Sequence, residues 1–108
     1  MNEFIELCKR IVSALIDYRD GLREEYENDE NKILRSSMVG IPVASTFISS
    51  ITADMSVTAQ RIVVVNNDID ELVKLVSIGD ESNIHNFIQN KLIYRDYISE
   101  VMEQFFYH

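Results

Sequence analysis

The fold is decided by residues 36–67, SSMVGIPVASTFISSITADMSVTAQRIVVVNN, in which Asp54 and Arg61 are the only charged side chains. Apolar residues recur through and beyond this stretch at alternating spacings of three and four, the period of an amphipathic helix. They form two seams: Leu34, Ile41, Ile48, Met55, Ile62, Ile69 and Val76 in the first, and Ala44, Ile51, Thr58, Val65 and Leu72 in the second. Ser, Thr, Ala and Val occupy most of the remaining surface, so we expect other helices to cover this one on more than one side.

A further helix is predicted before this segment, from about Asn2 to Tyr26. Its apolar stripe holds Phe4, Cys8, Ile11, Leu15, Tyr18 and Leu22. Gly21 interrupts it, and we expect a tertiary contact to offset the cost. The sequence Asn28-Asp29-Glu30-Asn31 then predicts a turn, because Asn can end a helix and Asp can cap the next one.

The last helix is predicted from about Glu81 to Phe106. Gly79 is suited to end the preceding helix, and Asp80 or Ser82 can cap this one. Its main apolar face consists of Ile84, Phe87, Ile88, Tyr94, Ile98, Val101 and Phe105, widened by Leu92, Met102 and Phe106.

Pro42 interrupts the central helix, which we expect from Glu30 to Ile78. Proline removes a backbone donor and disfavours helical geometry at the residue before it. The heptad phase is the same on both sides of the proline, which favours a kinked continuation over a restart. We therefore predict a single all-α domain over residues 1–108: an antiparallel bundle of three to four helices with a long, low-charge central helix kinked or restarted near Pro42.

An α+β fold is the alternative. Residues 61–68 include four consecutive β-branched side chains and could form a buried strand followed by a turn. Residues 39–43 could form a second strand. The intervening residues 46–53 do not alternate with period two, which favours the helical interpretation.

Composition excludes several classes of function. The 108 residues carry 18 acidic and 10 basic side chains, a net charge of −8 that disfavours nucleic acid as a partner. The uncharged segment 36–53 is rich in Ser and Thr and contains Gly40 and Pro42, so we expect no membrane span. The single Cys8 indicates a buried apolar side chain in a reducing, cytoplasmic setting.

Residues for chemistry are sparse. His85 and His108 are the only imidazoles and are far apart in sequence, so a metal site would lack ligands. The three glycines are scattered, whereas phosphate-binding loops bunch them. We expect no catalytic site, no metal and no cofactor.

The hypothesis that remains is a non-enzymatic, self-associating helical module that binds another protein, most simply as a homodimer. The residues predicted for self-association are Ile48, Ile51, Met55, Thr58, Ile62, Val65 and Ile69, with Thr58 as a polar residue that fixes the register. Such a module could be a small adaptor, a chaperone or an inhibitor of the immunity or phage-antagonist type.

Two features are predicted to bind the protein partner, which a negative surface suggests is basic. One is the aromatic end of the chain, Phe105, Phe106 and Tyr107, and the other is the acidic stripe of the first helix, Asp17, Asp20, Glu24 and Glu27. The alternative function is a small-ligand-binding oligomer with a polar site between protomers, built from Ser45, Ser49, Ser56, Asn66 and Asn67.

Overall fold

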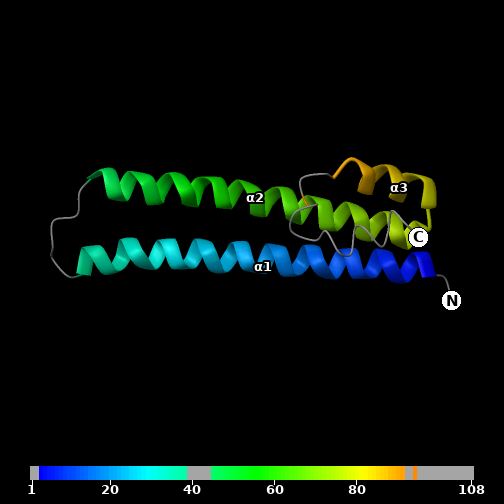
Figure 1. Cartoon of the computed structure of the whole chain (residues 1–108), viewed down its shortest axis with the longest axis horizontal. Coiled ribbons are helices and arrows are strands. Elements are labelled where there is room, and N and C mark those ends of the chain that lie inside the picture. The colour runs from blue at the N-terminus through cyan, green and yellow to red at the C-terminus, as the bar shows by residue number, and fades with distance from the viewer. Residues whose placement is uncertain (1–2, 39–44, 92–93, 95–108) are drawn as a thin grey trace. The chain divides into compact units, whose positions relative to one another are not determined.

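The computed structural model describes residues 3–38, 45–91 and 94 (Figure 1). Three helices make up almost all of them: α1 (Glu3–Met38), α2 (Ser45–Ile78) and α3 (Glu81–Gln89). These described residues contain no strand, and segment 61–68, the strongest strand candidate, lies within α2. The all-α prediction is therefore confirmed.

The chain divides into two compact units, and α1 and α2 contribute to both. The first unit comprises Met1–Tyr18 and Val65–His108, and the second comprises Arg19–Val64. Within each unit, α1 and α2 lie side by side and run in opposite directions (Figure 1). The single domain predicted from the sequence remains a prediction.

The first unit contains most of the buried apolar side chains. Three helices meet there, and the predicted stripe of α1 and the predicted face of α3 supply much of the core. Its buried apolar residues are Leu7, Cys8, Ile11, Leu15, Val65, Ile69, Leu72, Ile84, Phe87, Ile88 and Tyr94. The ring of Phe4 also stacks on His85 of α3, with 5.0 Å between the centroids. Burial of these side chains is the main favourable contribution to folding in this unit.

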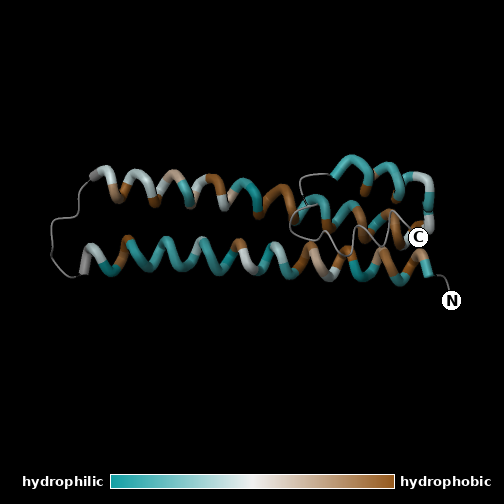
Figure 2. The backbone as a smooth tube through the Cα atoms, in the orientation of Figure 1, coloured by the Kyte–Doolittle hydropathy of each residue, from teal (hydrophilic) through white to brown (hydrophobic). Residues whose placement is uncertain are grey.

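The second unit has a much smaller interior. Only Leu22, Ile51 and Thr58 are buried among its described side chains, and Thr58 is polar. Figure 2 shows why: α1 is mostly hydrophilic along this unit, with few apolar residues to set against α2. Asp29 even occupies a largely covered position there, with its side chain 13% exposed and Lys32 Nζ 3.6 Å away.

A tight turn connects α2 to α3. Gly79 has a positive φ of 78° and its N–H donates to the carbonyl oxygens of Leu75 and Val76, at 3.0 and 3.1 Å. Such a left-handed residue satisfies the orphan carbonyls at a helix end. Asp80 then caps α3, accepting a hydrogen bond from the Asn83 N–H at 3.2 Å. Both expectations for this turn are confirmed.

The turn predicted at Asn28–Asn31 is wrong, because α1 continues through it to Met38. No Gly or Pro lies between Leu22 and Met38, and the Glu, Lys, Leu and Arg residues on both sides favour helix strongly enough to carry the Asn and Asp residues along. The described part of α1 ends at Met38, and the antiparallel α2 begins at Ser45. The long helix expected from Glu30 to Ile78 is therefore divided between α1 and α2, and Pro42 lies outside the described residues.

The last helix is shorter than predicted. It ends at Gln89, where the prediction continued to Phe106. Asn90 is a weak helix former, and beyond it the N–H of Tyr94 donates to the Lys91 carbonyl in a short turn. Residues 92–93 and 95–108, with the remainder of the predicted apolar face, lie outside the described residues.

The two described glycines should respond oppositely to alanine. An added Cβ would meet nothing within 4 Å at Gly21 or at Gly79, so backbone conformation alone decides the effect, and the tertiary contact expected at Gly21 is not found. We expect Gly79→Ala to destabilise the protein by about 1 kcal/mol because alanine is strained at positive φ. Gly21→Ala, inside α1, should stabilise it by roughly 0.5–1 kcal/mol. Urea unfolding of both variants measures the changes, and equal signs would contradict the assignment.

Candidate functional site

The residues predicted for self-association fall into two groups. Ile51, Thr58, Val65 and Ile69 are already buried within the chain, whereas Met55 and Ile62 are half-buried and Ile48 is exposed. In the second unit α1 is the only other described helix, so Ile51 and Thr58 pack toward α1. The heptad seam read from the sequence therefore serves contacts within the chain, and its role between chains stays a prediction.

The acidic stripe predicted for partner binding is exposed along α1. Asp17, Glu24 and Glu27 are exposed, and so is Asp20. Arginines lie next to Asp20: Arg19 Nε is 3.4 Å from Asp20 Oδ1 and Arg23 Nη1 is 3.9 Å from the same oxygen. Phe105, Phe106 and Tyr107 lie outside the described residues, so the aromatic part of the predicted site stays a prediction.

The side chains predicted for a ligand site between protomers are spread along α2. Ser49, Ser56 and Asn67 are exposed, Asn66 is half-buried, and the side chain of Ser45 is outside the described set. The four described residues are not among those that line the pocket in the first unit.

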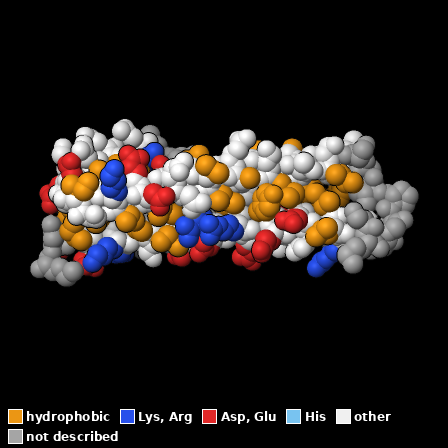
Figure 3. All heavy atoms as spheres, turned by 180° about the vertical axis from the view of Figure 1, so that it is seen from behind, with side chains coloured by type: hydrophobic (Ala, Val, Ile, Leu, Met, Phe, Trp, Pro, Cys, Tyr) orange, Lys and Arg blue, Asp and Glu red, His pale blue; other side chains and the backbone are white. Residues whose placement is uncertain are grey.

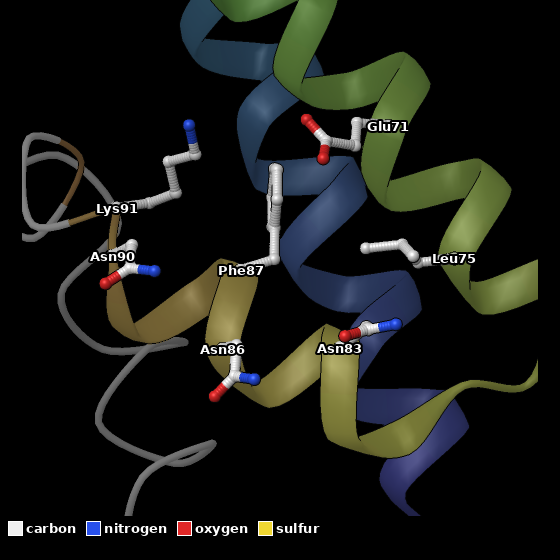
Figure 4. Close-up of a pocket in the computed structure, with 7 residues that line it drawn as sticks. All are labelled: Glu71, Leu75, Asn83, Asn86, Phe87, Asn90 and Lys91. Atoms are coloured by element: carbon white, nitrogen blue, oxygen red, sulfur yellow. The ribbon is translucent and has the colours of Figure 1, made fainter.

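A pocket of about 420 Å³ lies in the first unit, between α2 and α3 (Figure 4). It is lined by Glu71 and Leu75 from α2 and by Asn83, Asn86, Phe87, Asn90 and Lys91 from α3 and the residues that follow it. In Figure 4, Leu75 extends from α2 and Asn83 from α3 into the space between the two helices, and the Phe87 ring stands between α3 and α2. The lining thus combines amide, carboxylate and ammonium groups with an aromatic ring, a composition suited to a small polar molecule.

A buried carboxylate, Asp68, lies close to this pocket. Lys91 Nζ is 3.0 Å from Asp68 Oδ1, and the Tyr94 hydroxyl donates a hydrogen bond to Asp68 Oδ2. Asp68 is 5% exposed, so its charge depends on these two partners for compensation. Burial, reinforced by the hydrogen bond to Asp68 and the negative charge of Asp68, raises the pKa of Tyr94 far above its ordinary value. The hydroxyl therefore stays a donor at all physiological pH values.

Aromatic contacts extend the Asp68 cluster in two directions. Lys91 Nζ lies 4.9 Å from the centroid of the Phe87 ring, which lines the pocket. The Tyr94 ring meets the ring of Tyr18 edge to face, with 5.8 Å between centroids. The cluster thus fastens the residues after α3 to α1 and α2 within the first unit.

Cys8 is wholly buried, as the sequence predicts. Burial raises the pKa of the Cys8 thiol to about 11, and the negative charge of Glu81 adds to the shift. The thiol is therefore protonated at neutral pH, which makes it a poor nucleophile.

Sequence reasoning missed both the pocket and the Asp68 cluster. The pocket had a weak signal, since Asn83, Asn86 and Asn90 recur at spacings of three and four along the last helix. Asp68 had none, because an aspartate between Asn67 and Ile69, with Asp70 close by, is usually solvent-facing. In the described part of the chain, no three His, Cys, Asp or Glu side chains are grouped so as to hold a metal ion. None of the described helices combines the length and apolar character needed to cross a membrane.

Comparisons with known proteins add no assignment to this geometry. No family model, no curated protein and no solved structure matches the chain.

The Asp68 cluster can be tested through Tyr94. We expect Tyr94→Phe to lower the free energy of unfolding by about 1–3 kcal/mol, because it leaves a buried carboxylate with one partner fewer. The raised pKa means that folding favours the neutral hydroxyl, so this contribution is complete below pH 10 and is lost as the pH rises above 10.

Urea unfolding at pH 7 and between pH 9 and 11 measures both effects. Tyr26→Phe, at a half-buried position of α1, is the matched control. Equal losses in the two variants at pH 7 would show that the hydroxyl of Tyr94 contributes nothing.

Proposed function

We propose that this chain is a non-enzymatic helical interaction module that self-associates and binds another protein. The observation that carries the proposal is that the described part of the second unit exposes more large apolar side chains than it buries. Of the eight large apolar side chains exposed in the described residues, six belong to this unit: Leu34, Phe47, Ile48, Val57, Val63 and Val64. Only two apolar side chains are buried there. Hydrophobic side chains gather on the face of this unit seen in Figure 3, with acidic and basic groups beside them.

The balance between apolar burial and conformational entropy in the second unit favours an assembly over an isolated chain. A two-helix unit of this size buries little apolar surface to offset its conformational entropy, and oligomerisation or another partner usually supplies the remainder in such small units. Large exposed apolar patches bordered by polar residues are typical of interaction surfaces. A second pair of helices would turn the two-helix unit into a four-helix bundle, which is the common solution.

The kind of protein partner can be narrowed by charge. An inhibitor of a basic active site would use the acidic stripe of Asp17, Asp20, Glu24 and Glu27, and its affinity would fall steeply with salt. An adaptor or chaperone would use apolar contacts, including Phe105, Phe106 and Tyr107, and its affinity would change little with salt. Salt dependence of binding to a protein that co-purifies from the native host distinguishes these classes.

Self-association is tested by a matched pair of substitutions on α2. Val64 in the second unit and Val73 in the first are each 47% exposed, so neither substitution disturbs a core. We expect wild-type protein at tens of micromolar to be a dimer or larger by light scattering. Val64→Asp should weaken association at least tenfold by placing an uncompensated charge in the interface, and Val73→Asp should leave it unchanged.

A wild-type monomer at 100 μM would contradict the proposal. Equal dissociation by both variants would move the interface away from the second unit. Circular dichroism of the two variants confirms that the helices remain folded.

Binding of a small polar ligand is the second candidate function, favoured by the pocket beside Phe87. We expect any ligand found in a thermal-shift screen of metabolites and nucleotides to lose at least tenfold in affinity on Asn86→Leu. Asn31→Leu, at an exposed position of α1, should leave the affinity unchanged. Absence of any stabilising compound, or equal effects of the two variants, would exclude this site.

A further inference from the structure

A second heptad seam runs along the exposed side of α2 in the second unit. Its members alternate at spacings of four and three and are all exposed: Thr46, Ser50, Ala53, Val57, Gln60 and Val64. We call these six residues the outer seam. They lie on a different side of α2 from Ile51 and Thr58, whose seam packs toward α1.

Two unlike charges flank the outer seam. Asp54 follows Ala53 and Arg61 follows Gln60, so both occupy the same edge of the seam, two helical turns apart. They are the only charged residues of α2 in this unit. Both are exposed, and neither has an ion-pair partner in the part of the chain that the structure describes.

The same edge of α2 is covered by other residues of the chain where the helix continues into the first unit. Asp68 lies seven residues after Arg61 and is buried in the first unit beneath Lys91 and Tyr94. Glu71 and Leu75 continue this edge and line the pocket against α3. In the second unit, none of the described segments covers the corresponding row of Ser50, Asp54, Val57, Arg61 and Val64.

We infer that the outer seam pairs with the outer seam of a second copy of this chain, antiparallel and about a two-fold axis close to Val57. The inference rests on the proposed self-association and specifies its geometry. Reversing the direction of the second helix exchanges the order of the charges, so each Asp54 faces Arg61 of the other copy and two ion pairs form. In a parallel pairing, this edge of one helix would face the other edge of its partner, so Asp54 would not meet Arg61 and no ion pair would form.

Size complementarity supports the antiparallel register. Ala53 and Val64 bracket nearly the same midpoint as Asp54 and Arg61, so the small Ala53 of each copy lies opposite the larger Val64 of the other. Alternation of small and large residues across facing positions is what allows two helices to pack closely. The interface is isologous, with one surface patch used by both copies, as in most homodimers.

Charge reversal tests the pairing. Asp54→Arg and Arg61→Asp should each weaken dimerisation about tenfold, because each replaces two attractive contacts with repulsive ones. The double variant Asp54→Arg/Arg61→Asp should recover the wild-type dissociation constant. An equal mixture of the two single variants should form a heterodimer at least tenfold tighter than either homodimer, measured by sedimentation velocity at 50 mM salt.

Matched controls carry the same changes of net charge on the exposed surface of α2 in the first unit. Asp70→Arg and Lys74→Asp should leave the dissociation constant unchanged. Circular dichroism verifies that each variant is folded, which is expected at exposed positions.

The outcomes separate this inference from the proposed function. If the wild type dimerises but the single reversals act like their controls, the outer seam is not the interface although self-association stands. If the reversals weaken the dimer and neither the double variant nor the mixture recovers it, the antiparallel arrangement is overturned. If the wild type is a monomer whose unfolding midpoint falls on charge reversal, the seam is covered within the chain and both proposals fail.

Discussion

Burial of the apolar face of α3 is the contact on which the order of the first unit depends. Two antiparallel helices bury one seam between them, and their other faces stay in contact with water unless a third helix covers them. Helix α3 covers them with Ile84, Phe87 and Ile88. The largest fully buried side chains, among them Leu15 and Leu72, lie in this unit. This arrangement has a cost in desolvation free energy, because covering α2 removes the carboxylate of Asp68 from water. Lys91 and Tyr94 compensate its charge, and these contacts tie the two residues, which follow α3, to α2.

Much of the fold could be predicted because heptad spacing is a local property of the sequence. The apolar stripe of α1, the continuity of α2 through Val63–Val65 and the turn at Gly79–Asp80 all follow from periodicity and capping. The turn expected at Asn28–Asn31 was wrong because residues typical of caps also occur within helices when strong helix formers surround them. The end of α3 at its C-cap Asn90 could not be predicted from that residue type, because α1 continues through Asn28 and Asn31.

The candidate site was harder to predict than the fold for a related reason. A heptad seam gives the side of a helix that is covered, and it does not distinguish a neighbour in the same chain from one in another chain. Ile51, Thr58, Val65 and Ile69 have the pattern of an oligomer seam and are buried within one chain. The residues with the stronger structural argument for association, Val57 and Val64, are separated along the outer seam by the polar Gln60. Val57 and Val64 differ from the buried seam residues in their solvent exposure, which cannot be read from the sequence.

Polar groups in the second unit give its small interior a specific role. Thr58 is 4% exposed and Asp29 is largely covered, so this interior contributes little free energy and restricts the alignment of α1 against α2. The proposed self-association would cover α2 in this unit and add the apolar burial that its own interior lacks. One edge of α2 carries Asp54, Arg61 and Asp68. Asp68 pairs with Lys91 of the same chain. Asp54 and Arg61 lie two helical turns apart, and the proposed two-fold axis would bring each of them to the other in the second copy.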